Sequence, residues 1–436
     1  MSEHTDRSPA SEPAVSRRKL LAGGAAVGAG LFVAPSLASA MFHGTAQAMK
    51  VGLIGCGGRA RGALWDAINA AKVTGMELEI VGVCDWFEDR AKETAREHSI
   101  DESLAFHGGD SYKKVCDAGC DLILTATPPL FRATHVRAII ESGAHAFIEK
   151  PVAVDPVGIR HMLETGKMAD EKKLCVVAGT QRRHGKDYQA QKNALDDGKL
   201  GEIVGGEVNW NQGALWWKTR NEGESVADYL VRNWVSFLEM SGDHIVEQHV
   251  HNIDIAAWFL GRYPRAAVAF GDRVRRQTGN QYDFFSTDFD FGEGVHIHSM
   301  CRQINGCVNN VGEHFKTTTG QIWGGQRMVG ENGPLEMPGE QPYGHYVAEH
   351  VDLQNAIMNG EHINEIENVT MSTASAMMGR ISAYTGERVL MDDLLTNTSS
   401  KFYNLECQIP ASAFEDGGSS ISLPEEGSAP RPGTEA

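Results

Sequence analysis

The chain has 436 residues, of which 42% are hydrophobic and 22% are charged, and its formal net charge is −17 at pH 7. A chain this acidic repels nucleic acid and anionic membrane surfaces, which argues against both as partners. The length is sufficient for two domains with substantial hydrophobic cores.

Residues 1–40 are predicted to be a twin-arginine signal peptide. Arg17 and Arg18 precede a Gly- and Ala-rich apolar run to about residue 37, and Ala38-Ser39-Ala40 is a cleavage candidate, with a second at residues 46–48. The alternative is a transmembrane anchor, but the run is weakly apolar and barely long enough to span a bilayer. We therefore expect a mature protein without a membrane span, exported in folded form to the periplasm or another extracytoplasmic space.

Residues 48–178 alternate between predicted strands and predicted helices. The strands fall at residues 50–54, 78–84, 121–126, 146–148 and 174–178, and the helices at 61–71, 134–142 and 156–169. This alternation predicts a parallel sheet covered by helices on both faces. We therefore predict an α/β fold with an N-terminal Rossmann dinucleotide-binding domain.

The turn after the first predicted strand carries a dinucleotide-binding pattern. Gly55, Gly57 and Ala60 are spaced as G-x-G-x-x-A, with Gly58 and Arg59 inside the same turn. Glycines permit a tight turn and close approach of the backbone to a pyrophosphate, whose charge then meets the N-terminus of the next helix. The alternative is a glycine-rich turn in a fold that no longer binds a nucleotide.

Asp85 ends the second predicted strand, where an acid would bind the adenine ribose hydroxyls. A carboxylate there repels a 2′-phosphate, so NAD is favoured over NADP, although Arg59 and Arg61 weaken that preference. A nicotinamide cofactor in an exported protein would have to travel inside the folded chain, because free NAD is scarce outside the cytoplasm. We therefore expect NAD to be tightly bound.

Two more strand ends reach the same edge of the predicted sheet. Thr127 and Pro128 close the third of these strands. Proline cannot continue a strand ladder, so the chain leaves the sheet here and heads toward the crevice. The alternative is a plain turn without a role in the site. His135 follows in the first turn of the next helix, where packing is the alternative to a role in cofactor binding. In the Glu149-Lys150-Pro151 corner, proline biases Lys150 toward an extended backbone that aims its side chain into the crevice.

The second half of the chain predicts a different architecture. Strands are predicted at residues 203–210, 266–270, 287–291, 294–300 and 310–317, and helices at 251–260, 348–358 and 371–384. This pattern predicts an α+β domain at residues 179–412 with an open, mostly antiparallel sheet, whose uncovered face favours a homodimer or homotetramer. The Gly/Ser/Pro/Glu-rich residues 413–436 are predicted to be disordered.

These motifs together resemble the Gfo/Idh/MocA oxidoreductase family. The resemblance rests on the glycine turn, Asp85, Thr127-Pro128-Pro129, His135 and Glu149-Lys150-Pro151, and in the second half on residues 198–203 and the helix at 251–261. It covers nearly the whole mature chain and implies an NAD-dependent oxidoreductase that acts on carbohydrate CH–OH groups. The family's Glu-Lys-Pro lysine lies near the nicotinamide and the reacting hydroxyl, and Lys150 is its match.

The family's substrate helix commonly reads Asp-x-x-x-His-x-x-Asp. In this chain His251 and Asp254 match, Glu247 replaces the first acid, and His249 stands where glycine is common. These departures leave the division of roles among Glu247, His249 and His251 open.

The chemistry requires such groups independently of the resemblance. Oxidation of a secondary alcohol removes the O–H proton as hydride leaves carbon; His251 is suited to accept that proton and Lys150 to stabilise the alkoxide. Glu247, one helical turn before His251, is expected to orient its ring. The alternative is a structural helix start with acids near its dipole. Alternate histidines diverge on a helix, so no metal is expected.

Further substrate contacts are expected from two places. Arg182 and Arg183 follow the last strand of the first half at the crevice edge. Trp234 belongs to an aromatic group in a polar stretch, together with Trp210, Trp216, Trp217 and Tyr229. Aromatic rings stack on the C–H faces of sugars, and packing against the helices is the alternative for this group.

The function predicted from the sequence is hydride transfer between a tightly bound NAD and a secondary alcohol of a sugar, glycoside or polyol. The alternative is a glycoside hydrolase or lyase that uses the same first step, with transient oxidation at C3, elimination and re-reduction. The chain lacks the Tyr-Gly-Asn-His-Tyr-Pro-Thr-His-Gly stretch expected in the N-acetylgalactosaminidase branch of the family. A non-catalytic sugar-binding protein is a third possibility, against which Lys150 and His251 argue.

Overall fold

The computed structural model describes residues 48–433. The predicted signal peptide at residues 1–40 and the last three residues of the predicted tail lie outside this range. Residues 48–433 belong to one compact unit that contains both sheets.

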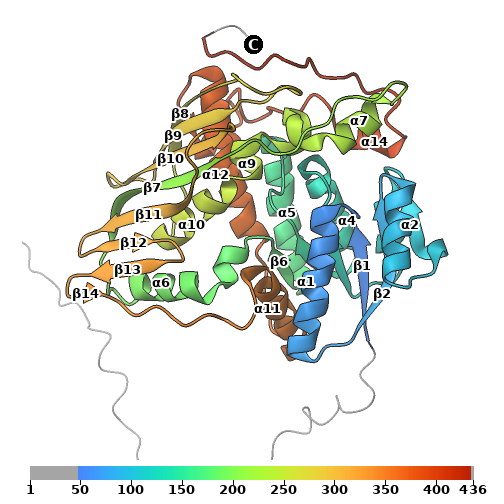
Figure 1. Ribbon diagram of the computed structural model, residues 1–436, viewed down its shortest axis with the longest axis horizontal. Coiled ribbons are helices and arrows are strands. Elements are labelled where there is room, and N and C mark those ends of the chain that lie inside the picture. Colours follow the sequence, from blue (N-terminus) through green and yellow to red (C-terminus); the bar gives the residue numbers. More distant parts are fainter. Residues whose placement is uncertain (1–47, 434–436) are drawn as a thin grey trace, which may run out of the picture. The chain divides into compact units, whose positions relative to one another are not determined.

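The first sheet contains six parallel strands in the order β3-β2-β1-β4-β5-β6 (Figure 1). The strands are β1 (Met49–Ile54), β2 (Leu78–Asp85), β3 (Ala105–His107), β4 (Leu122–Thr125), β5 (His145–Ile148) and β6 (Val176–Ala178). The chain order reverses between β1 and β4, which places a crevice at the carboxyl ends of these strands. The predicted Rossmann architecture is confirmed, and only the three-residue β3 was not predicted.

Helices cover both faces of this sheet. They are α1 (Gly58–Thr74), α2 (Glu88–Glu97), α3 (Ser111–Cys116), α4 (Arg132–Ser142) and α5 (Pro156–Lys172). A later helix, α11 (His345–Asn359), returns from the second half of the chain to pack beside α1. Its Leu353 and Ala356 join the cluster formed by the helix α1 and the strands β1 and β4. This return brings α11 to the edge of the crevice.

The second sheet has nine strands in the order β14-β13-β12-β11-β7-β10-β9-β8-β15, and every neighbouring pair is antiparallel except β7 and β10. The long strands are β7 (Ile203–Gln212), β8 (Ala266–Asp272), β9 (Phe284–Asp290), β10 (His296–Gln303) and β11 (Asn310–Thr317), and the short ones are β12 (Gln321–Trp323), β13 (Arg327–Gly330), β14 (Gly333–Pro334) and β15 (Val389–Leu390). The predicted mostly antiparallel sheet is therefore confirmed.

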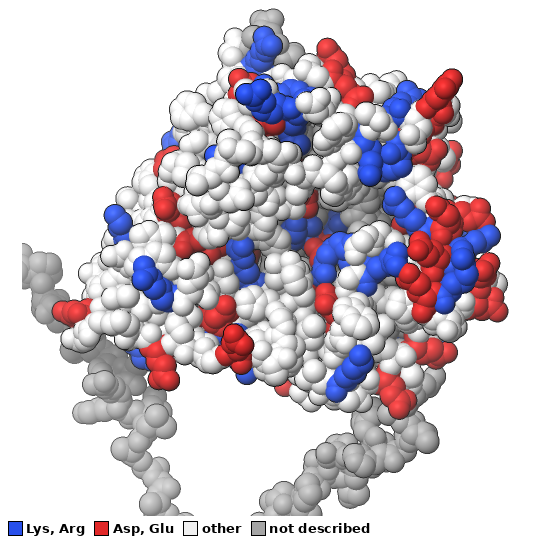
Figure 2. Space-filling view, in the orientation of Figure 1, with Lys and Arg blue, Asp and Glu red and all other residues white. Residues whose placement is uncertain are grey.

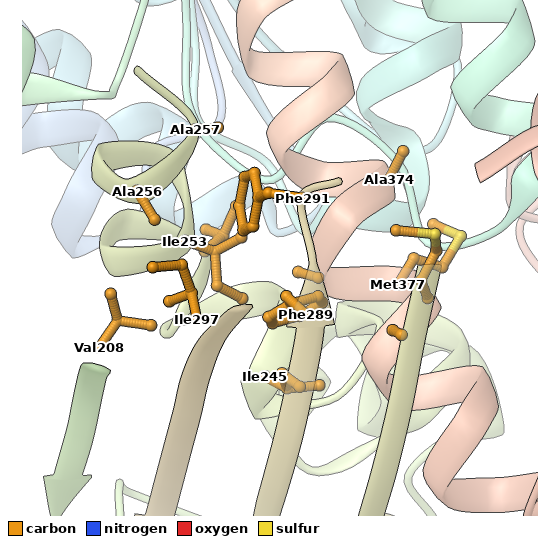
Figure 3. Close-up of a cluster of buried hydrophobic side chains, with 14 of the residues drawn as sticks. Val208, Ile245, Ile253, Ala256, Ala257, Phe289, Phe291, Ile297, Ala374 and Met377 are labelled. Carbon is orange, nitrogen blue, oxygen red and sulfur yellow. The ribbon is translucent and has the colours of Figure 1, made fainter. Parts of the chain in front are cut away.

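Two helices cover one face of this sheet, α10 (Val250–Leu260) and α12 (Ile366–Thr385). Inward side chains of the strands, such as Phe289 and Ile297, meet Ile253 of α10 and Met377 of α12 in a fully buried cluster (Figure 3). Burial alternates along β10, as expected for a strand with one covered face. The opposite face exposes apolar side chains, and Phe270 on β8 is 72% exposed.

The shorter helices connect these layers. They are α6 (Lys186–Asp196), α7 (Val226–Arg232), α8 (Leu238–Ser241), α9 (His244–Glu247), α13 (Met391–Leu395) and α14 (Ser412–Glu415), with 3₁₀ turns η1 (Glu102–Leu104), η2 (Pro129–Phe131), η3 (Gln181–His184) and η4 (Trp234–Ser236). The segments from α7 to α9 matter most for function, because they lead from the second sheet toward the crevice.

The C-terminal segment differs from the expectation of disorder. Residues 413–433 lie on the folded unit, and Phe414 and Ile421 are buried in a cluster with Phe131 and Leu230. The composition of this segment is polar and Gly/Ser-rich, but these two apolar side chains bury enough surface to hold the chain in place. Composition alone therefore predicted its order incorrectly.

On the face shown in Figure 2, Lys and Arg side chains are interspersed with Asp and Glu. Within residues 48–433, no helix is both long and apolar enough to cross a membrane.

Candidate active site

The glycine turn after β1 forms the base of the crevice. Gly55 has a φ of +94°, a backbone conformation that side chains rarely adopt. A Cβ placed on Gly57 or Gly58 would meet no atom within 4 Å, so the space above the turn is open. Ala60 is fully buried and sets the close approach of α1 to the sheet. This geometry fits a pyrophosphate lying over the turn and the start of α1.

Asp85 connects the end of β2 to the same turn. Its Oδ2 accepts a hydrogen bond from the backbone N–H of Cys56 at 2.8 Å, and its Oδ1 accepts one from Phe87 at 2.9 Å. Burial raises the pKa of this carboxyl, and the two backbone hydrogen bonds oppose the shift. Asp85 lines the pocket with Gly55 and Gly57, as an acid that binds ribose hydroxyls should.

Aromatic side chains form the walls of this pocket. Trp86, Tyr112, Phe131 and Trp234 line it, beside Thr127, Pro128 and His135. The Nδ1 atom of His135 lies 3.2 Å from the hydroxyl of Thr127, and its ring lies 4.3 Å from that of Tyr112. Burial lowers the pKa of His135 to about 3, so the ring is neutral and serves as a packed wall.

The C-terminal segment covers the outside of these walls. The ring of Phe414 meets Phe131 at 5.0 Å and Trp86 at 5.7 Å, both edge to face. Glu415 accepts a hydrogen bond from the hydroxyl of Tyr112 at 2.8 Å. Residues near the chain end thus support three side chains of the nucleotide pocket, which the sequence did not reveal.

A second cavity, of about 270 Å³, continues from the first toward the second sheet. Lys150, Glu247 and His251 line it, and Thr127 and Trp234 line both cavities. The structure therefore places the three predicted catalytic residues in one cavity that adjoins the nucleotide pocket. The residues where the two cavities meet would hold the nicotinamide end of a dinucleotide bound across the strand ends.

Lys150 projects from the corner after β5 toward the segment between α9 and α10. Its Nζ donates hydrogen bonds to the backbone carbonyl of Glu247 at 2.5 Å and to the Oε1 atom of Glu247 at 3.2 Å. Both side chains are about 10% exposed or less. Lys150 is therefore held as a hydrogen-bond donor at the cavity wall.

The expected contact between Glu247 and His251 is absent from residues 48–433. The helix is interrupted, since α9 ends at Glu247 and α10 begins at Val250. Glu247 consequently turns to Lys150, and its Oε2 atom has no hydrogen-bond partner. Glu247 positions the lysine and does not orient the histidine.

His251 is held by stacking. Its ring lies 5.5 Å from that of Trp210, at an interplanar angle of 24°. Burial lowers the pKa of His251 well below its usual value, and the nearby Lys150 and Arg182 lower it further. Neither ring nitrogen has a hydrogen-bond partner within residues 48–433. The imidazole is therefore neutral, and a substrate hydroxyl can donate a proton to it.

An ionic network forms part of the cavity wall, because Arg59, Glu149 and Tyr346 all line the cavity. Arg59 pairs with Glu149, with Asp66 and with Glu349, and its guanidinium stacks on the ring of Tyr346 at 4.7 Å. Burial raises the pKa of Glu349 well above its usual value, and the Glu149 carboxylate adds to the shift. Arg59 thus anchors Glu149 beside Lys150 in the wall of this cavity, and it is not among the residues that line the nucleotide pocket.

Arg132 is a further site residue without a sequence signal. Its guanidinium is buried and donates hydrogen bonds to the backbone carbonyls of Glu149 and Thr127. Burial lowers its pKa to about 10, whereas the charge of Glu149 opposes that shift. Arg132 therefore ties together two strand ends that line the cavity.

Four predicted substrate residues lie outside this cavity. Arg183 makes two hydrogen bonds of 2.8 Å to Asp254, which also accepts one from Ser372. His249 is fully buried against Ser299, and Arg182 pairs with Glu313. These side chains support α10 and the second sheet, and of the predicted substrate residues only Trp234 lines the cavity.

Comparisons with known proteins agree with this geometry. A model described as the oxidoreductase family with an NAD-binding Rossmann fold matches residues 49–180, and the GFO/IDH/MocA C-terminal domain matches residues 188–310. The chain is 28% identical over 231 residues to scyllo-inositol 2-dehydrogenase (NAD(+)) of Bacillus subtilis, covering 51% of this chain and 58% of that protein. It is 30% identical over 219 residues to a glycosyl hydrolase family 109 protein of Streptomyces coelicolor, covering 44% of each chain.

A solved oxidoreductase from Thermotoga maritima shares the fold. It has a TM-score of 0.64 at 20% identity, and the match covers 80% of this chain and 100% of that chain. The two curated relatives are matched over less than two thirds of their own lengths.

Proposed function

The chain belongs to the Gfo/Idh/MocA oxidoreductase family, and we propose that it transfers hydride between a tightly bound NAD and a secondary alcohol of a sugar, glycoside or polyol. The observation that carries this proposal is the placing of Lys150 and a neutral His251 in one cavity that opens into the nucleotide pocket. The similarity to an inositol dehydrogenase supports a polyhydroxylated ring as the substrate class.

Each residue has a defined task in this reaction. NAD, when bound between the glycine turn and Lys150, supplies the hydride acceptor. His251 accepts the proton of the reacting hydroxyl, because its lowered pKa keeps the ring free. The ammonium of Lys150 stabilises the negative charge that develops on the same oxygen, and Glu247 holds the ammonium in place. The indole rings of Trp210 and Trp234 exclude water from the cavity wall.

Export and cofactor retention belong to the same proposal. The Arg17-Arg18 motif supports export of the folded chain to an extracytoplasmic space. The packing of Phe414 and Glu415 behind the nucleotide pocket supports slow release of NAD. A retained NAD would be reoxidised by a second carbonyl substrate before the next turnover, which would give ping-pong kinetics.

The test is to purify the mature protein, denature it and identify the released nucleotide by mass. Native protein is then mixed with inositols, aldoses and methyl glycosides while the absorbance of reduced nicotinamide is followed. Released NAD and reduction by at least one of these compounds would support the proposal. Recovery of no nucleotide would contradict tight binding, and no reduction by any compound, even with added NAD, would contradict the activity.

Glycoside cleavage is a second candidate, supported by the similarity to a glycosyl hydrolase family 109 protein. Oxidation at C3 would acidify the C2 proton, elimination would expel the aglycone from C1, and addition of water with return of the hydride would complete hydrolysis. The same cavity residues would serve its first step. Release of p-nitrophenol from a nitrophenyl glycoside without net formation of reduced cofactor would favour this candidate.

We also propose that the open face of the second sheet pairs with another copy of the chain in a homodimer or homotetramer. Its apolar side chains include Phe270 at 72% exposure and Val204 at 50%. Large exposed apolar patches are uncommon on monomeric proteins, whereas apolar sheet faces are typical of subunit contacts. Light scattering of the wild-type protein and a Phe270→Glu variant would test it: a wild-type monomer would contradict the proposal.

A further inference from the structure

A separate pocket lies at the carboxyl ends of β7 and β10, the parallel pair of the second sheet. It has a volume of about 530 Å³. Residues that follow β7, including Trp216 and Trp217, form one side, and residues from the end of β10 onward, including Gln303 and Asn305, form another. We call it the Trp217 pocket. It has no part in the hydride transfer described above.

The Trp217 pocket adjoins the catalytic cavity. Trp210 stacks on His251, and Ala214, which lines the pocket, follows only four residues later. Four residues of extended chain span at most about 14 Å. The rings of Trp216 and Trp234 also meet edge to face at 6.0 Å, and Trp234 lines the catalytic cavity. These two indoles form the partition between the cavities.

The walls of the pocket combine exposed aromatic faces with fixed polar groups. Trp216 and Trp217 are each 46% exposed, which is unusual for adjacent tryptophans without a ligand or partner. The guanidinium of Arg276 is held by the carbonyl of Tyr282 at 2.6 Å and by the Oε1 atom of Gln303 at 2.8 Å. The Nε2 atom of Gln303 is buried without a hydrogen-bond partner.

Charged groups of both signs also line the pocket. Arg275 lines it, and its guanidinium makes no ion pair within residues 48–433, while the Asp283 carboxylate accepts the backbone N–H groups of Val274 and Arg275 at 2.6 and 2.7 Å. Asn305 accepts a hydrogen bond from the backbone of Ala214 at 2.9 Å and thereby fixes the start of the tryptophan loop. Apolar faces beside a few placed donors are the features of a small-molecule site. A pyranose ring, with C–H faces and hydroxyl edges, matches both.

We propose that the Trp217 pocket binds the second sugar ring of a glycoside whose first ring reacts beside Lys150 and His251. This inference rests on the proposed function and sharpens it, since it makes a disaccharide or larger glycoside the preferred substrate. The partition formed by Trp216 and Trp234 then lies beside the glycosidic bond. A monosaccharide would fill the catalytic cavity alone and gain nothing from the tryptophan loop.

The test compares methyl glycosides with disaccharides that share the same reacting ring: methyl β-glucoside with cellobiose, methyl α-glucoside with maltose, and methyl β-galactoside with lactose. Reduction of the bound cofactor is measured for the wild-type protein and for Trp217→Ala. The matched control is Trp65→Ala, because Trp65 is 59% exposed on α1 and lines neither cavity.

The expected result is a higher kcat/KM for the disaccharide of a reactive pair, and a loss of that advantage in Trp217→Ala. The ratio of disaccharide to monosaccharide kcat/KM should fall about 10-fold, equivalent to about 1.4 kcal/mol, while Trp65→Ala leaves it unchanged. Equal kcat/KM values within each pair, or a ratio that Trp217→Ala does not alter, would overturn the second-ring site and leave the oxidoreductase proposal standing. Failure of all six compounds while an inositol still reduces the cofactor would overturn the second-ring site alone, and failure of the inositol as well would count against both.

Discussion

Substitution of Lys150 by methionine separates its catalytic role from its structural role. Methionine keeps most of the side-chain volume and removes the ammonium that faces the cavity. Loss of one preorganised donor to a developing oxyanion costs about 2.7–4 kcal/mol, so we expect kcat to fall on the order of 100- to 1,000-fold. The variant also leaves Glu247, whose side chain is 9% exposed, without its cation.

An unpaired buried charge has its own cost, of roughly 3–5 kcal/mol in folding stability. The pair formed by Arg183 and Asp254 provides the control, because its side chains are 11% and 3% exposed and lie outside the cavity. Arg183→Met should lower the melting temperature to a similar degree, while the folded protein keeps its kcat. The double variant Lys150→Met/Glu247→Gln should recover stability but not turnover.

The assay is reduction of bound cofactor by a reactive sugar, followed in a stopped-flow instrument, with thermal unfolding measured in parallel. Turnover of Lys150→Met at the wild-type rate would refute the catalytic role, as would a loss of kcat per folded molecule in Arg183→Met as large as that in Lys150→Met. The first result would remove the lysine from the chemistry. The second would show that the loss follows from damage to the fold around α10.

Three other predictions concern neighbouring parts of the site. Burial depresses the pKa of His251 below its usual value of 6.5, so the ring stays deprotonated as pH falls through that value. The acid limb of the kcat/KM profile should therefore lie below pH 6.5. A limb at or above pH 6.5 would contradict the role of His251 as the base. Asp85→Ser removes the carboxylate that would bind the ribose hydroxyls, so the affinity for NAD should fall on the order of 10- to 100-fold and the preference for NAD over NADP should narrow. The nucleotide content of purified protein and competition between the two nucleotides measure these effects. Unchanged selectivity between NAD and NADP would argue against this role of Asp85. Phe414→Ala removes a ring that is 1% exposed and should lower the free energy of unfolding by about 3–5 kcal/mol. It should also speed release of nucleotide on dialysis. Normal retention of the nucleotide would show that the C-terminal segment does not hold the cofactor.

Local patterns in the sequence predicted the parts of this site that depend on short-range structure. Gly55 and Asp85 were predicted at strand ends because a turn and a strand terminus are set by neighbouring residues. Lys150 and His251 were assigned from their motifs, and the structure places both in one cavity. Their catalytic roles stay predictions until the variants are measured.

Features that depend on long-range contacts were not predictable in this way. Arg59 lies in the glycine turn, but its partner Glu349 is 290 residues away on α11, a helix whose return to the first sheet leaves no local signal. The turn of Glu247 toward Lys150 depends on the interruption between α9 and α10, whereas the spacing alone places Glu247 one helical turn before His251. The order of the C-terminal segment depends on the ring of Phe414 finding Trp86 and Phe131.

The central claim is that hydride moves from a carbinol carbon to a cofactor that stays in the protein. It is tested most directly by following a deuterium label. The mature protein with its own nucleotide is mixed with substrate carrying deuterium on its ring carbons, such as perdeuterated myo-inositol or glucose, and the nucleotide is recovered by rapid denaturation for mass analysis. The expected product is reduced nicotinamide that carries one deuterium from the sugar, with far less of it formed by Lys150→Met. A sugar that turns over while its carbon-bound label is lost only to water would contradict the account.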